Sequence, residues 1–244
     1  IAAYETHLPS CAIVRSVPSG TFEQVTLRLG ILHALRENGV MVWNNARAIE
    51  ACVDKSMTTF LISKAGLSTP ETWTAQSHDE AVALVASQCA EEPLVLKPLF
   101  GAQGRGLRLV RSANDLPSES EIAGVYYFQR FIEPVGEHWE DYRLFVCGGK
   151  VIAGMRRIGQ SWITNIKQGA KAQPLKLTRD LVEMAERAAD AVGADYAGID
   201  LIQGKDFSER IKRLLGAFGR YVGRDAYIDN AIFMSERTTG HRNR

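Results

Sequence analysis

The first 70 residues alternate apolar and polar stretches in the order expected of strands and helices. An apolar run at 11–15 predicts a strand, and turn residues separate it from 21–38, where apolar residues recur at helical spacing. A second run at 40–43 predicts a parallel strand. Asp54 can cap a helix that ends near Gly66. The pattern predicts an α/β lobe over residues 1–70.

Residues 71–203 mix short strands with two helices. A capping box at Ser77 opens a predicted helix to about residue 90, and the other helix begins at Thr178. Two α+β lobes are therefore predicted, 71–135 and 136–203, which makes the fold class α/β and α+β. The predicted strands cover 94–97, 106–110, 125–131, 141–147, 150–157 and 197–202.

The last segment, 204–244, differs from the rest in charge. The formal net charge is +1, yet this tail carries nine basic and five acidic side chains, whereas acids outnumber bases before it. Apolar residues at 211–222 have amphipathic-helix spacing, which would suit a partner or a phosphate. We favour the alternative of a replaced terminus, such as a frame change or a fusion scar. The chain also begins with Ile1 instead of Met, which suggests a fragment or a trimmed product.

Composition narrows the class of protein. A hydrophobic fraction of 45% and a charged fraction of 23% exclude a disordered or low-complexity chain. The near-zero net charge gives no support for nucleic acid, and no apolar run is long enough for a membrane span. The four cysteines lack metal-site spacing and are typical of free thiols in a reducing compartment. We expect a cytoplasmic protein with no nucleic-acid or membrane partner.

Lys97 is the first residue that suggests chemistry. It ends an apolar strand and opens the glycine-rich segment KPLFGAQGRG. Glycines let backbone N–H groups approach phosphate oxygens, and a lysine adds a point charge. A hairpin turn with a solvated lysine explains this segment equally well, so on its own it leaves both interpretations open.

Several motifs, taken in order, resemble the RimK-type ligases of the ATP-grasp superfamily. Within that type the sequence is similar to α-L-glutamate ligases, including those that act on tetrahydromethanopterin. The resemblance covers about residues 11 to 203 and implies an ATP-grasp fold, in which an N-terminal α/β lobe is followed by two α+β lobes that clasp ATP. The motifs are DK at 54–55, VLKPLFGAQGRG at 95–106, FQRFIEP at 128–134, DYR at 141–143, the stretch from MRR at 155–157 through Asn165 to GA at 169–170, and AGID at 197–200.

The resemblance implies a nucleotide site. Two lysines would contact the phosphates, the glycine loop would cover the triphosphate, and hinge backbone groups would read the adenine edge. Family members usually carry a glutamate after the hinge glutamine, where this sequence has arginine, so backbone recognition is what remains expected there. Arg143 would support the nucleotide-contacting acid or form a salt bridge between strands. The implied ATP-binding residues are Lys55, Lys97, Gly101, Gly104, Gly106, Gln129, Arg130, Phe131, Ile132 and Asp141.

The same resemblance implies catalytic and metal-binding residues. Arg157 and Asn165 would hold the transferring phosphate and the acyl phosphate, because phosphoryl transfer depends on fixed positive charge. Arg156 fits an exposed strand residue better. Asp200 would bind Mg²⁺, with Mn²⁺ as an alternative. The family's Glu-x-Asn, on the next strand, is absent, since positions 212 and 214 do not match it, and we expect that strand to be missing.

The implied activity is ATP-dependent formation of an amide through an acyl phosphate. L-Glutamate as the amine and a small-molecule or peptide carboxylate as the acceptor rest on the resemblance, as does an expected homo-oligomer. A nucleotide-binding pseudoenzyme or truncated product without turnover is the alternative, which the missing metal motif favours. A nucleic-acid binder that uses the basic tail is a third and weaker hypothesis.

Overall fold

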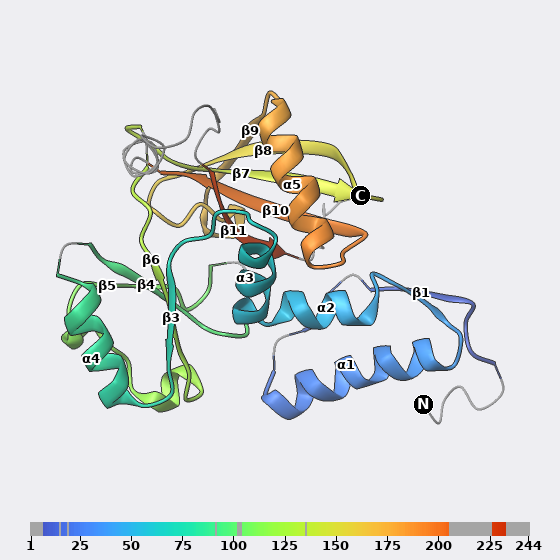
Figure 1. The fold of residues 1–244 in the computed structure, drawn as a ribbon, viewed down its shortest axis with the longest axis horizontal. Coiled ribbons are helices and arrows are strands. Elements are labelled where there is room, and N and C mark those ends of the chain that lie inside the picture. The colour runs from blue at the N-terminus through green and yellow to red at the C-terminus, as the bar shows by residue number, and fades with distance from the viewer. Residues whose placement is uncertain are drawn as a thin grey trace, which may run out of the picture.

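The computed structural model describes residues 7–14, 16–18, 20–90, 92–101, 104–134, 136–204 and 226–232. These residues form a helical N-terminal unit with two short parallel strands, a four-stranded sheet and a five-stranded sheet (Figure 1). No helix within the described ranges is long and apolar enough to cross a membrane.

The N-terminal unit carries the strands and long helix that the sequence pattern predicts. Its first helix begins at a capping box between Thr21 and Gln24, and Asp54 accepts hydrogen bonds from two backbone N–H groups of α3, which confirms the predicted cap. The helix α2 was not predicted. In chain order the elements are β1 (Cys11–Ile13), α1 (Phe22–Glu37), β2 (Met41–Trp43), α2 (Ala46–Val53) and α3 (Lys55–Lys64).

The four-stranded sheet is antiparallel throughout, with the strand order β3-β6-β4-β5. Leu94, Leu96, Tyr126 and Phe128 lie in a buried core on the side of helix α4. Alternate residues of β4 and β6 therefore face away from that helix. The predicted glycine-rich hairpin between β4 and β5 is confirmed, whereas β3 was not predicted. The elements are β3 (Thr72–Ala75), α4 (His78–Gln88), β4 (Leu94–Lys97), β5 (Arg108–Val110), the 3₁₀ turns Ala113–Asp115 and Glu119–Ile122, and β6 (Tyr126–Arg130).

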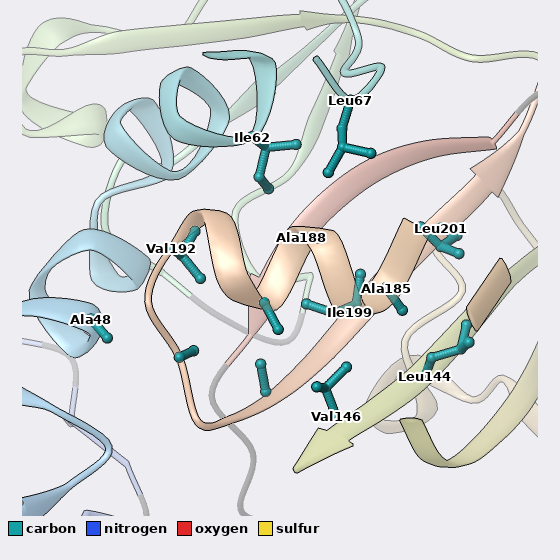
Figure 2. Packing of buried hydrophobic residues seen from close by; sticks show 13 residues of the cluster. Ala48, Ile62, Leu67, Leu144, Val146, Ala185, Ala188, Val192, Ile199 and Leu201 are labelled. Atoms are coloured by element: carbon teal, nitrogen blue, oxygen red, sulfur yellow. The ribbon is translucent and has the colours of Figure 1, made fainter. Parts of the chain in front are cut away.

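The five-stranded sheet is also antiparallel, in the order β11-β10-β7-β8-β9. Helix α5 lies along one face, and its Ala185 and Ala188 pack with Leu144 and Ile199 of the sheet (Figure 2). The small alanines let the helix approach the strands closely. The elements are β7 (Trp139–Cys147), β8 (Lys150–Gly159), the 3₁₀ turn Ile166–Gln168, β9 (Lys171–Pro174), α5 (Arg179–Ala191), β10 (Tyr196–Gln203) and β11 (Ala226–Ile232).

The N-terminal unit joins the core of the five-stranded sheet. Ala48 of α2 and Ile62 of α3 belong to the same buried cluster as Val192 and Leu201 (Figure 2). This packing fixes the start of α3, and therefore Lys55, relative to the five-stranded sheet. Burial of this apolar surface is the main source of that attachment.

The C-terminal expectation requires a correction. We expected the strand that carries the family's Glu-x-Asn to be missing beside β10, yet β11 pairs with β10 and places Asn230 opposite Asp200. The expectation was wrong about the neighbouring strand, because a pairing between segments this far apart leaves no local pattern, whereas β11 itself, with the sequence AYIDNAI, contains no Glu-x-Asn. The amphipathic spacing at 211–222 lies outside the described residues. The predicted lobe boundaries at 70, 135 and 203 stay predictions.

Candidate functional site

A cleft lies between the four-stranded and five-stranded sheets, on the side of the first sheet that faces away from α4. It is lined from α3, β4, β6, β7, β8, β10 and the adjoining loops. Every residue predicted for the site except Gly106 lines it, so residues far apart in the sequence share one surface. The lining predicted residues are Lys55, Lys97, Gly101, Gly104, Gln129, Arg130, Phe131, Ile132, Asp141, Arg157, Asn165 and Asp200.

Two nearly buried lysines approach the cleft from different elements. Lys55 is the first residue of α3, and its Nζ donates to the carbonyl oxygens of Leu99 and Gly101 at 3.2 and 2.8 Å. Lys97 is the last residue of β4 and, through strand alternation, shares the cleft side with Val95. The pair brings two positive charges next to the glycine-rich loop.

The glycine-rich loop reaches across the cleft. Gly104 has a φ of 68°, and a β-carbon there would lie 2.5 Å from Oδ1 of Asn165 and 2.9 Å from Ile163. Gly106, with a φ of 72°, leaves room instead for Pro98, 2.8 Å from where its β-carbon would be. Glycine is therefore required at Gly104 both by backbone conformation and by close approach of the opposite lobe.

Gln129 carries a buried hydrogen-bond acceptor that has no protein partner. Gln129 is 2% exposed, and its Nε2 donates to the Thr72 hydroxyl at 3.2 Å and the Tyr127 hydroxyl at 3.0 Å. Oε1 has no hydrogen-bond partner among the described groups. A buried acceptor without a partner is costly, and because Gln129 lines the cleft, a ligand donor that reached Oε1 would remove this cost.

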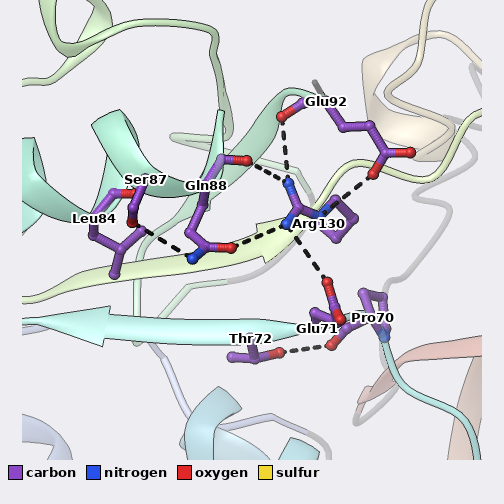
Figure 3. A network of polar contacts seen from close by, with 8 residues as sticks. All are labelled: Pro70, Glu71, Thr72, Leu84, Ser87, Gln88, Glu92 and Arg130. Carbon is purple, nitrogen blue, oxygen red and sulfur yellow. Dashed lines mark hydrogen bonds and ion pairs between the residues drawn. The ribbon is translucent and has the colours of Figure 1, made fainter. Parts of the chain in front are cut away.

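The side chain of Arg130 points away from the cleft, opposite to that of Gln129. Its guanidinium donates to the Gln88 carbonyl at 2.8 Å and pairs with Glu71 and Glu92 (Figure 3). It also lies 4.8 Å from the centre of the Trp73 ring. This network ties the end of α4 to the edges of β3 and β6. These contacts hold the Arg130 side chain outside the cleft, so the expectation that this position reads the nucleotide through its backbone stays a prediction.

Two acid–arginine pairs lie on the cleft face of the five-stranded sheet. Asp141 stands opposite Arg157 in the β7–β8 register, and the guanidinium of Arg157 binds both carboxylate oxygens. Thr164 donates to the same carboxylate at 2.7 Å. Asp200 stands opposite Arg143 in the β10–β7 register, and Arg143 binds its two oxygens at 2.6 Å each.

The two pairs are joined into one cluster. Nη2 of Arg157 lies 3.1 Å from Oδ2 of Asp200, so this arginine contacts both carboxylates. Arg143, which the sequence left between a nucleotide role and a salt bridge, forms the salt bridge. Arg156 contacts Glu140 and Gln173 on the opposite face of β8 and is partly exposed, in agreement with the sequence interpretation.

Burial and the arginines shift the pKa values of the two acids in opposite directions. Burial, with the charge of Asp200 in addition, raises the pKa of Asp141 to about 6, although Arg157 and Thr164 oppose the shift. Burial would also raise the pKa of Asp200, but Arg143 and Arg157 outweigh it and hold that pKa below its usual range. Asp200 is thus the more firmly ionised of the two.

The sequence analysis missed an aromatic wall of the cleft. Phe131 of the hinge makes edge contacts with Trp139 and Trp162, at centroid distances of 5.9 and 6.0 Å. Both tryptophans line the cleft. The alternation of β7 offered a signal for Trp139, which shares a strand face with Asp141, whereas Trp162 lies in a loop without a pattern.

The order of these site residues matches one family of proteins. A family model described as the RimK-like ATP-grasp domain matches residues 52–209, which is more than half of the chain. The chain belongs to the RimK-like ATP-grasp family. All of the predicted site residues, from Lys55 to Asp200, fall within the matched range of this RimK-like chain.

Curated relatives share substantial sequence with this RimK-like chain. The tetrahydromethanopterin:α-L-glutamate ligase of Methanosarcina acetivorans is 37% identical over 209 residues, which cover 79% of this chain and 63% of the relative. The ligase of the same description from Methanococcus maripaludis is 36% identical over 202 residues, covering 80% and 67%. The chain thus spans about two thirds of the length of these relatives.

Solved structures confirm the ATP-grasp fold. The ATP-grasp ligase PsnB, complexed with a minimal precursor, aligns with a TM-score of 0.62 at 21% identity and covers 93% of this chain and 71% of its own. The D-alanine–D-alanine ligase of Bacillus anthracis, complexed with ATP, gives 0.58 at 15% identity, covering 83% and 62%. At these identities the likeness concerns the fold alone.

Proposed function

We propose that this chain is an ATP-dependent carboxylate–amine ligase that adds L-glutamate to a carboxylate acceptor. One observation carries the proposal: two lysines and an arginine from different elements surround a single cleft in a chain that is similar to α-L-glutamate ligases. The positive groups are Lys55, Lys97 and Arg157. They suit a reaction in which negative charge builds up on a transferring phosphoryl group.

The cleft fits ATP by its own chemistry. The adenine amino group would supply the donor that Oε1 of Gln129 lacks, while the hinge backbone at 130–132 reads the ring edge. Lys55 and Lys97 would hold the phosphates under the glycine loop, whose tip at Gly104 lies against the opposite lobe. The base would therefore lie against β6 and the hinge, and the triphosphate beneath the glycine loop.

The reaction proceeds in two steps. An oxygen of the acceptor carboxylate attacks the γ-phosphorus of ATP, and the bond to the β,γ-bridging oxygen breaks, which gives an acyl phosphate and ADP. The glutamate amine nitrogen then attacks the acyl carbon, loses a proton and expels phosphate, so that an amide forms. Arg157 and Asn165 would stabilise the transferring phosphoryl group and the acyl phosphate from the β8 side.

The acceptor is a small molecule or a peptide with a free carboxylate. The relatives above are described as tetrahydromethanopterin:α-L-glutamate ligases, and another structure of PsnB is described as complexed with a precursor peptide. Phe131, Trp139 and Trp162 provide an aromatic, apolar surface within the cleft, with the rings packed edge to face. This surface suits a planar group of either the nucleotide or the acceptor.

A coupled assay of ADP release tests the proposal. We expect release only when L-glutamate and a carboxylate acceptor are both present, with a panel of reduced pterins and acidic peptides as acceptors. Lys97→Met should lower the rate by about a hundredfold or more. Lys176→Met, which removes the same charge from an exposed position, should not change it. ADP release that is indifferent to both co-substrates would contradict the proposal.

A nucleotide-binding protein without turnover is a second candidate, favoured by the arginine contacts that occupy both oxygens of Asp200. Such a protein would bind ATP through the same lysines and hinge. Calorimetry of ATP binding separates the two candidates. Affinity that is unaffected by magnesium favours the second candidate, and a strong dependence on magnesium favours the ligase.

A further inference from the structure

Both carboxylate oxygens of Asp200 are bound by arginine side chains. Arg143 donates from Nε to Oδ1 and from Nη2 to Oδ2, both at 2.6 Å, and Nη2 of Arg157 lies 3.1 Å from Oδ2. The Asp200 side chain is 3% exposed and that of Arg143 is 12% exposed. A planar guanidinium that binds both oxygens in a dry site is the strongest common form of ion pair.

The charges around Asp200 do not suit a free divalent cation. Two guanidinium groups balance the two carboxylates, so the cluster of Arg143, Arg157, Asp141 and Asp200 has a formal charge of zero. Lys55 and Lys97 add positive charge to the same cleft. Within the described ranges, no group of three or more His, Cys, Asp or Glu side chains could hold a metal ion. The residues as they stand therefore do not fit a resident Mg²⁺ ion.

A bound nucleotide would supply both things that the site lacks for Mg²⁺, namely negative charge and further oxygen ligands. Its triphosphate brings several negative charges and the oxygen atoms that Mg²⁺ prefers, and protein Mg²⁺ sites commonly use one or two carboxylates with substrate phosphates. The local charge then favours a dication where it previously opposed one.

We propose that Arg143 keeps Asp200 closed to free divalent cations, so that the ion enters this cleft only together with a nucleotide. Arg143 is in this view a positioning residue that sets the order of binding. The nucleotide half of the statement rests on the proposed function, whereas the exclusion of the free ion does not. The exclusion of the free ion and the proposed function can therefore be tested separately.

Free Mn²⁺, which has a six-line electron paramagnetic resonance signal that is lost on binding, is the probe. The full chain is titrated with Mn²⁺ alone and then with Mn²⁺ and a non-hydrolysable ATP analogue. We expect no loss of signal from the wild-type protein alone. Arg143→Gln should bind Mn²⁺ without nucleotide, at least about tenfold more tightly than wild type. The substitution removes one positive charge that repels the ion and the guanidinium that competes with it for the oxygens of Asp200. Adding Asp200→Asn should abolish this gain.

Two further variants make the result specific. Arg156→Gln removes the same charge from the opposite face of β8 and should leave Mn²⁺ binding at the wild-type level. Arg143→Lys keeps the charge but loses the two-point contact, so it should bind Mn²⁺ more weakly than Arg143→Gln. If Arg143→Gln does not fold by circular dichroism, Arg143→Lys is compared with wild type instead: it should bind Mn²⁺ more tightly, because the two-point contact with Asp200 is lost, and equal binding would overturn the inference.

Each outcome has one meaning. Tight Mn²⁺ binding by the nucleotide-free wild type would overturn the inference, as would an Arg143→Gln protein that folds and gains no affinity. If the analogue fails to bind while the nucleotide-free titrations behave as expected, the proposed function is wrong and the exclusion by Arg143 stands. Loss of Mn²⁺ signal that appears only with the analogue, and that exceeds the loss caused by the same analogue without protein, supports both.

Discussion

The side-chain amide of Asn44 is joined to the backbone of Tyr196 by two hydrogen bonds. Nδ2 donates to the Tyr196 carbonyl and Oδ1 accepts from the Tyr196 N–H, both at 2.7 Å. Asn44 is 1% exposed and directly follows β2, whereas Tyr196 begins β10. The amide thus imitates a strand pairing between the N-terminal unit, which carries Lys55, and the sheet that carries Asp200.

Asn44→Ala should therefore destabilise the attachment of the N-terminal unit. It leaves the backbone N–H and carbonyl of Tyr196 without partners, and we expect a loss of about 2 kcal/mol or more in the free energy of unfolding. Asn38→Ala deletes an exposed amide with one bond, to the Ala34 carbonyl, and should cost less than about 1 kcal/mol. Urea unfolding measures both variants, and equal losses would count against this role of Asn44.

Gln129 should set the preference for adenine. Inosine triphosphate has a carbonyl in place of the adenine amino group, so it offers no donor to Oε1, and wild type should bind it at least about tenfold more weakly than ATP. Gln129→Met should lose most of this discrimination. Calorimetric titration of both nucleotides gives the ratio.

Arg130 provides the control for that measurement, because it neighbours Gln129 but its guanidinium lies outside the cleft. Arg130→Gln should lower stability and leave the ratio between ATP and inosine triphosphate at its wild-type value. A ratio that is unchanged in Gln129→Met, or altered in Arg130→Gln, would show that the base is not read by the Gln129 side chain.

The raised pKa of Asp141 makes a prediction about pH. A carboxyl group whose pKa is about 6 in the folded protein and about 4 when unfolded stabilises the fold below pH 4, and this contribution is lost as the pH rises to 6. Between pH 4 and 6.5 the unfolding free energy of wild type should fall by about 2 to 3 kcal/mol relative to Asp141→Asn. Parallel stability curves for the two proteins would contradict this assignment.

The local sequence pattern predicted the elements that are long or that begin at a clear capping residue. The helical spacing of α1 and the Asp54 cap of α3 are examples, and each depends only on neighbouring residues. The strand β3 and helix α2 were missed because four and eight residues are too few to show a period. The side chains of Gln129 and Arg130 point to opposite faces of β6, as successive residues of a strand do. The same alternation could have predicted this from the sequence.

Contacts set by strand register could not be predicted from the sequence. The pairing of Arg143 with Asp200 requires that β7 and β10 be neighbours in one particular register, and 57 residues separate the two side chains. The pairing of β11 with β10 is of the same kind. The motif resemblance supplied the identities of the site residues, whereas their mutual contacts required the fold.

Gly104→Ala should separate closure of the glycine loop from simple backbone strain. A β-carbon at Gly104 would meet Asn165 at 2.5 Å, so alanine should hold the loop away from the opposite lobe and lower the rate of ADP release by about tenfold or more. Gly124, in the same sheet unit, also has a positive φ, of 77°, but has open space around it. Gly124→Ala should therefore cost about 1 kcal/mol of stability and no activity. Because both substitutions impose similar strain, equal rates in the two variants would show that contact between the loop and Asn165 is not needed for turnover.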